Sequence, residues 1–163
     1  MKKLAIIGMP MDLGIPSVAV KCVEIWRNTS GEGDFLVCNI FAQMHKEKGT
    51  MDPVDHETYT SLFEAMVMTP YFPHPNLLIY LEGTLDNIID RIHDRGRPME
   101  QQTPIAYWEE MHGRYEKWID SFNGCPVLRL NINDYDIIEN PDSVEAIVER
   151  IGHFMEQTEA LRK

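Results

Sequence analysis

The stretch NLLIYLEGTLDNIIDRIHDRGRPMEQ, residues 76–101, decides the fold class of this chain. Asn76 to Leu81 is a short apolar run between a pair of prolines and a glycine, which is typical of a buried strand. Thr84 can cap the helix that follows, and Gly96 predicts its end because glycine readily adopts positive φ. Four apolar side chains of this helix share one face, which we expect to pack against a sheet: Leu85, Ile88, Ile89 and Ile92.

Three arginines close this strand and helix unit: Arg91, Arg95 and Arg97. Only 15 of the 163 residues are lysine or arginine, so three within seven residues concentrate positive charge in a chain of net charge −11. The planar guanidinium binds phosphate oxygens in pairs, and ligands of open α/β sheets bind at the carboxyl ends of the strands. The cluster therefore indicates a site for a small anion. The alternative is that these cations only offset the dipole at a helix C-terminus.

The rest of the chain alternates strand and helix signals, with a turn-rich break at residues 28–34. Strands are predicted at residues 3–8, 35–38 and 126–131. Helices are predicted at residues 18–26 and 40–48, and in the segments that begin at Asp52-Pro53, Thr103-Pro104 and Asn140-Pro141. Because helical segments separate the strands, we expect a parallel sheet with flanking helices.

The composition is that of an ordinary globular protein. Hydrophobic residues make up 44% of the chain, and we expect a single domain over residues 1–163. No apolar run approaches the roughly 20 residues of a transmembrane helix, so we expect a cytoplasmic protein that does not bind membranes. The scattered cysteines offer no metal-ligand spacing, and we assign no metal ligands. The acidic charge argues against nucleic acid as a partner.

Four segments, in this order and spacing, resemble the bacterial deoxynucleoside kinases: IFAQMHKEKGTMD, ETYTSLFEAMVMTPYFPHPNLLIYLEG, DRIHDRGRPMEQQTPIAYWEEMH and PVLRLNINDYD. The resemblance covers residues 40–151 and is strongest to the deoxyadenosine/deoxycytidine kinases of bacilli. It implies a three-layer, P-loop-kinase-like α/β fold, here with an incomplete sheet of about three or four strands. It also implies ATP-dependent phosphorylation of the 5′-hydroxyl of deoxyadenosine or deoxycytidine, with Mg²⁺, in a homodimer. Nucleosides and nucleotides are then the expected small-molecule partners.

The resemblance assigns roles to individual residues. Arg91, Arg95 and Arg97 match the family's lid motif R-x-x-x-R-G-R, which closes over the donor phosphates and offsets their charge during transfer. Glu100 matches the lid glutamate that binds the sugar 3′-hydroxyl, and Phe41 matches the aromatic residue that stacks on the substrate base. Asp134 and Tyr135 fall in the loop that holds the adenine of ATP. Without the family alignment, core packing would be the expected role of both aromatic side chains.

Residues 1–39 depart from the family pattern. A phosphate loop needs G-x-x-x-x-G-K-[ST], whereas the turn after the first predicted strand is GMPMDLGIPS and contains no lysine. Glu32 stands where the family has the arginine of its Arg-Ser motif, and Val37 where it has the base-reading aspartate. Glu24 is the nearest candidate for the general base. We therefore expect impaired phosphoryl transfer. Two alternatives stay open: a non-catalytic truncated relative that binds nucleotide or dimerises, and a rearranged or frame-shifted N-terminal segment without selected activity.

Overall fold

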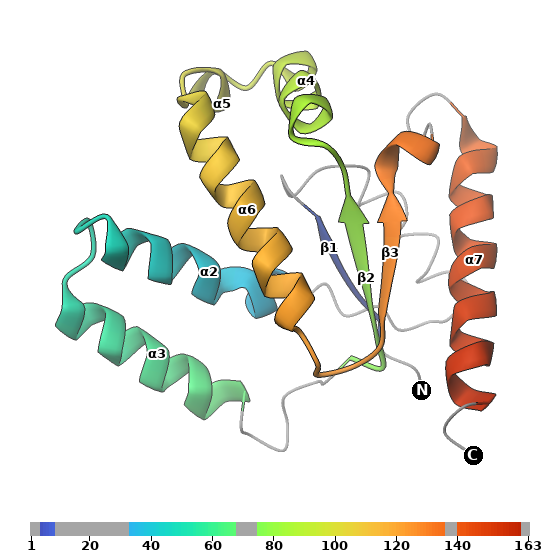
Figure 1. Cartoon of the computed structure of the whole chain (residues 1–163), viewed down its shortest axis with the longest axis horizontal. Coiled ribbons are helices and arrows are strands. Elements are labelled where there is room, and N and C mark those ends of the chain that lie inside the picture. The colour runs from blue at the N-terminus through green and yellow to red at the C-terminus, as the bar shows by residue number, and fades with distance from the viewer. Residues whose placement is uncertain (1–3, 9–32, 68–74, 136–139, 161–163) are drawn as a thin grey trace.

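The computed structural model describes residues 4–8, 33–67, 75–135 and 140–160, and this part of the chain is built around a three-stranded parallel sheet (Figure 1). The strands are β1 (Leu4–Gly8), β2 (Leu77–Glu82) and β3 (Val127–Asn131), in the order β1-β2-β3. Ile79 of the central strand pairs with Ile6 of β1 and with Leu128 of β3. Every residue from 77 to 81 is buried, which explains why β2 is a continuous apolar run rather than an alternating one.

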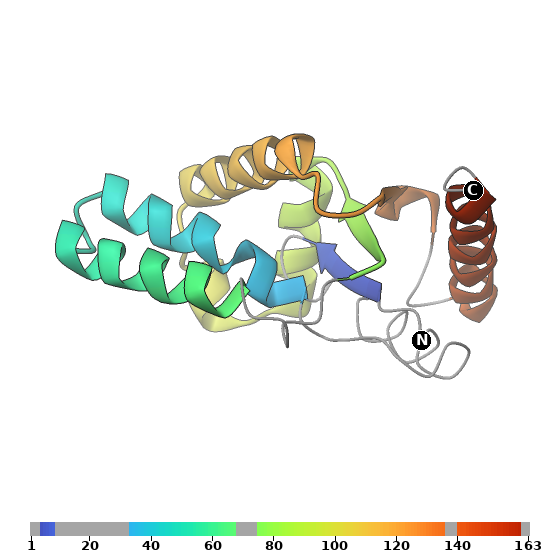
Figure 2. The same cartoon turned by 90° about the horizontal axis from the view of Figure 1, so that it is seen from below.

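Helices flank the sheet on two sides (Figures 1 and 2). On one side lie α2 (Gly33–Glu47), α3 (Pro53–Val67) and α6 (Ile105–Ser121), and on the other lies α7 (Pro141–Ala160). Three short elements follow the carboxyl ends of the strands in Figure 1: α4 (Leu85–Arg95), α5 (Pro98–Gln101) and the 3₁₀ helix η1 (Ile132–Asp134). The predicted α/β fold, a parallel sheet with flanking helices, is confirmed.

The sheet and the helices share one hydrophobic core. Side chains of α2, α4, α6 and α7 belong to it: Ile40, Met44, Ile88, Ile92, Met111, Tyr115, Ile119, Ile147, Val148, Ile151 and Met155. Leu85 and Ile89 of the predicted α4 stripe are only half-buried. Burial of these apolar side chains is the main favourable term that holds the layers together.

Local signals place the ends of several helices where the sequence predicts them. The Thr84 side chain accepts a hydrogen bond of 3.4 Å from the Asn87 backbone N–H at the start of α4. Gly96 ends this helix in the left-handed region with φ of 71°. Asp52 caps α3 by accepting a hydrogen bond of 2.8 Å from the Val54 N–H.

Two sequence predictions about secondary structure are wrong. Residues 35–38 belong to α2, which begins at Gly33, so the predicted strand and the last part of the predicted break are helical. A four-residue apolar run does not distinguish a strand from a buried turn of helix. Thr103 does not cap α6, because its hydroxyl donates to the Met99 carbonyl oxygen at 3.0 Å and Pro104 stands at the cap position. The predicted helix at 18–26 and the turn at 9–17 lie outside the described residues.

The described helices include none that could cross a lipid bilayer as a long apolar segment.

Candidate functional site

The carboxyl ends of β2 and β3 meet in a close contact. A Cβ atom at Gly83, directly after β2, would lie 2.7 Å from the Ile132 Cδ1 atom in η1, so only glycine fits there without displacing Ile132. His112 of α6 reaches the same point, with its Nε2 atom 3.0 Å from the Gly83 carbonyl oxygen. The contact therefore joins α6, β2 and η1 at the edge where ligands of open α/β sheets bind.

Arg91 ties α4 to this edge. Its Nη2 atom donates to the Ile132 carbonyl oxygen at 3.3 Å, in the turn that continues to Asp134 and Tyr135. The Tyr135 hydroxyl accepts a hydrogen bond of 3.0 Å from the Arg150 Nη1 atom of α7, and the Asp134 side chain is exposed. The structure thus brings the first arginine of the cluster to the predicted adenine loop.

Arg95 and Arg97 converge on one carboxylate. The Nε and Nη2 atoms of Arg95 donate to Glu100 Oε2 at 3.0 and 2.6 Å, and both side chains are only 20% exposed. The Arg97 Nη1 atom lies 3.6 Å from the other oxygen, Oε1, and its side chain is 58% exposed. Two guanidinium groups therefore face the two oxygens of a single anion, which is also how arginines share a phosphate group.

The backbone after Gly96 creates this convergence. The left-handed conformation of Gly96 turns the chain out of α4, and Pro98 then opens the four-residue helix α5 that carries Glu100. Gln101 holds α5 in place, because its Nε2 atom donates to the His93 carbonyl oxygen of α4 at 3.3 Å. The sequence predictions omit α5, although proline at a first helical position is a signal for it.

Glu100 also lines a cavity of about 320 Å³ between α4, α5 and the start of α6. Its apolar walls include Ile92, Ile105 and Trp108, and its polar wall includes His93 and Glu100. Glu100 thus contacts the arginines and also borders this partly open cavity.

Phe41 lies apart from the arginines in the α2–α6 interface. Its ring meets that of Tyr115 edge to face, with centroids 6.3 Å apart. The observed contact matches the packing role of an aromatic side chain, and stacking on a base stays a prediction.

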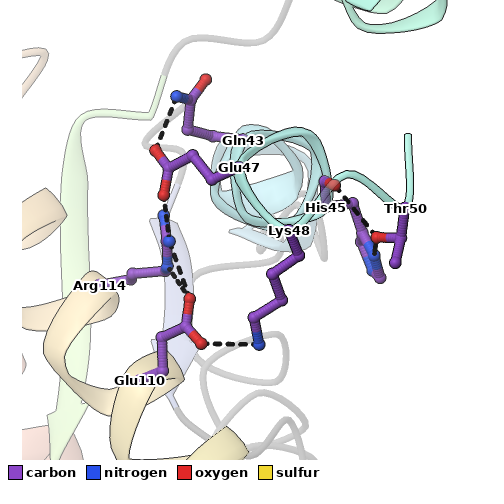
Figure 3. A network of polar contacts seen from close by, with 7 residues as sticks. All are labelled: Gln43, His45, Glu47, Lys48, Thr50, Glu110 and Arg114. Atoms are coloured by element: carbon purple, nitrogen blue, oxygen red, sulfur yellow. Dashed lines mark hydrogen bonds and ion pairs between the residues drawn. The ribbon is translucent and has the colours of Figure 1, made fainter. Parts of the chain in front are cut away.

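Ion pairs continue the same interface toward the end of α2 (Figure 3). Arg114 of α6 bridges Glu47 of α2 and Glu110 of its own helix, and Lys48 lies 2.6 Å from Glu110. The hydrogen bond from Arg114 lowers the pKa of the Glu47 carboxyl, and the contact with Lys48, followed by that with Arg114, lowers the pKa of Glu110. These contacts link the end of α2, the helix that carries Phe41, to α6.

A second ionic cluster surrounds Arg129 of β3. Its guanidinium contacts Glu82, Glu116 and Asp120 at 3.2, 3.1 and 2.5 Å. The Tyr80 hydroxyl donates to Glu116 at 2.8 Å, and burial, followed by this hydrogen bond, raises the pKa of Tyr80. No sequence motif marks this cluster, because its members come from β2, β3 and α6.

A metal site is not formed by the part of the chain that the structure describes: no three histidine, cysteine, aspartate or glutamate side chains come together there as ligands.

The model of the deoxynucleoside kinase family matches residues 35–156, slightly more than the predicted span. The deoxyadenosine/deoxycytidine kinase of Bacillus subtilis is 66% identical over 113 residues, which cover 69% of this chain and 52% of that protein. The deoxyadenosine kinase of Lactobacillus acidophilus is 29% identical over 119 residues, which cover 69% of this chain and 55% of that protein. The chain therefore spans about half the length of the curated relatives it matches.

A solved structure shows the same fold. The deoxyadenosine kinase of M. mycoides, determined with the products dCMP and a flexible dCDP bound, superimposes with a TM-score of 0.69 at 17% identity. The match covers 93% of this chain and 99% of that one, and the fold is the P-loop-kinase-like fold of these enzymes. The family match and the fold agree, and the chain belongs to the deoxynucleoside kinase family.

Proposed function

We propose that this chain acts in ATP-dependent phosphoryl transfer to the 5′-hydroxyl of deoxyadenosine or deoxycytidine. In that reaction the γ-phosphoryl group moves from ATP to the 5′-oxygen, which loses its proton, and ADP leaves. The observation that carries the proposal is the convergence of Arg95 and Arg97 on one two-oxygen anion at the carboxyl edge of a parallel sheet. Such a pair suits the non-bridging oxygens of a phosphate group.

The described residues fit the phosphates of ATP better than they fit a metal ion of the protein's own. Arg95 and Arg97 direct N–H donors to one carboxylate, and Arg91 donates to the turn that carries Asp134 and Tyr135, the proposed adenine contacts. Mg²⁺, when bound with ATP, would offset the charge of the phosphates. We therefore assign Mg²⁺ to the nucleotide and no ligand for it to the described side chains.

We further propose that the chain alone turns over slowly. Its sequence has no phosphate-loop lysine, and Glu32 and Val37 stand where the family has an arginine and a base-reading aspartate. Positioning and charge neutralisation supply nearly all of the catalysis of phosphoryl transfer. Losing one interaction worth about 4 kcal/mol lowers a rate roughly a thousandfold.

Phosphorylation of deoxyadenosine and deoxycytidine by the purified chain with Mg-ATP tests both statements. A slow transfer that Arg95→Ala/Arg97→Ala abolishes would support the proposal. A turnover near one per second would refute the impairment, and a residual transfer that the double substitution leaves unchanged would refute the role of the lid.

The alternative of a dimer that only binds nucleotide has one observation in its favour. Three apolar side chains on α3 are strongly exposed: Val54 (67%), Leu62 (60%) and Met66 (40%). Their spacing of eight and four residues places them along one side of the helix. A second copy of the chain could cover this stripe, because α3 packs against α2 and projects away from the sheet (Figure 1).

A further inference from the structure

Glu100 presents a carboxylate to the same guanidinium atoms that a phosphate group would use. Its Oε2 atom accepts hydrogen bonds from both Nε and Nη2 of Arg95, and Oε1 faces Arg97. A guanidinium has a fixed set of donors in one plane, so a phosphate that binds the Nε and Nη2 edge of Arg95 meets Glu100 already there. The contact therefore affects the affinity for anions as well as the stability of α5.

We propose that Glu100 is an intramolecular competitor for the phosphate-binding arginines, and that a phosphate group takes over Arg95 only when the Glu100 carboxylate leaves it. This inference rests on the proposed function of the lid and adds a control of its affinity. It also explains how three arginines can lie close together in the sequence despite their like charges. Arg91, Arg95 and Arg97 repel one another, and the single negative charge of Glu100 lies next to two of these cations and reduces their repulsion.

The geometry favours exchange over a permanent ion pair. Glu100 sits on a helix of only four residues that follows the left-handed Gly96, and it borders a cavity of about 320 Å³. The pair is partly exposed at 20% on each side, so solvent can replace either partner during the exchange. Gln101 also ties α5 to α4, through a hydrogen bond from its Nε2 atom to the His93 carbonyl oxygen that does not involve Glu100.

A purely structural role of Glu100 predicts the opposite effect of Glu100→Gln on the affinity for anions. If Glu100 only stabilises the lid, then Glu100→Gln loosens α5 and weakens anion binding. If Glu100 competes, the same substitution strengthens anion binding. We expect an increase of about fivefold or more, the lower end of typical coupling between two ligands.

The test is calorimetric titration of the purified chain with sodium tripolyphosphate at low ionic strength, where charge interactions are weakly screened. Wild type, Glu100→Gln and Glu110→Gln are compared. Glu110→Gln is the matched control, because Glu110 also pairs with an arginine, Arg114, but lies in the α2–α6 interface (Figure 3). Circular dichroism verifies that each variant is folded.

Tighter binding of tripolyphosphate by Glu100→Gln, with unchanged binding by Glu110→Gln, would support the proposal that Glu100 competes for Arg95. Equal or weaker binding by Glu100→Gln, beside a wild type that binds, would overturn it and leave the proposed function standing. An equal gain in both variants would also overturn it, because the effect would then be one of net charge. If neither wild type nor any variant bound tripolyphosphate, both the competitor role of Glu100 and the proposed phosphate binding by the lid would be refuted.

Discussion

Gly83→Ala tests the close contact between the end of β2 and Ile132 of η1, the residue to which Arg91 of α4 also donates a hydrogen bond. The new Cβ atom would lie 2.7 Å from Ile132 Cδ1 and 2.9 Å from Ile132 Cγ1, whereas ordinary contacts begin near 3.4 Å. Ile132 is 1% exposed and packs in the core, so it has little room to withdraw. Overpacking of this kind costs about 1–3 kcal/mol. In a chain of this size we expect the midpoint of thermal unfolding to fall by roughly 2–4 °C for each kcal/mol.

Gly113→Ala is the matched control, because nothing lies within 4 Å of a Cβ at that position in the interior of α6. The same chemical change there should stabilise the protein by about 0.5–1 kcal/mol, since alanine favours the helix. Both variants are compared by urea and thermal unfolding. Ile132→Val, which removes the nearer atom Cδ1, should reduce the penalty of Gly83→Ala in a double-mutant cycle. If Gly83→Ala were as stable as Gly113→Ala, the close contact between β2 and η1 would be wrong.

Three further predictions concern ionic contacts and association. The lowered pKa values of Glu47 and Glu110 mean that these carboxylates contribute stability above the ordinary carboxyl pKa, and that it is lost as the pH falls through the lowered values. Below about pH 4.5, wild type should therefore lose more stability than Arg114→Gln, as chemical unfolding at several pH values would show, and parallel curves would contradict this. Arg129→Ala should cost about 1–3 kcal/mol because it leaves three carboxylates without their shared cation, and no loss in urea unfolding would mean that the cluster is not a stabilising unit. Leu62→Asp should convert a dimer into monomers in light scattering, and a wild-type monomer would remove the proposed interface.

The central strand and α4 could be predicted from sequence because their signals are local. A continuous apolar run, the Thr84 cap and the Gly96 terminator all act within a few residues of the elements they define. The parallel arrangement also followed, since helices separate the strands. The start of α2 could not be predicted from sequence. Glycine and aspartate at positions 33 and 34 favour turns on their own, and the helix that they join extends far beyond them.

The site was predictable in part. The clustering of Arg91, Arg95 and Arg97 is visible in the sequence, and in the structure two of them contact the carboxylate of Glu100. Their partner Glu100 was identified only through the family motif, because its approach to Arg95 depends on the backbone angles of Gly96 and on the short helix α5. The Arg129 cluster depends on three elements that meet only in the folded protein.

The central claim is that the arginine lid binds the phosphates of a nucleotide. The most direct test is calorimetric titration of ATP into wild type, Arg95→Ala/Arg97→Ala and Lys48→Ala/Arg114→Ala, since the last variant removes the same charge at the α2–α6 interface. We predict that ATP binding is lost only in Arg95→Ala/Arg97→Ala. Equal affinity of all three proteins for ATP would contradict the claim.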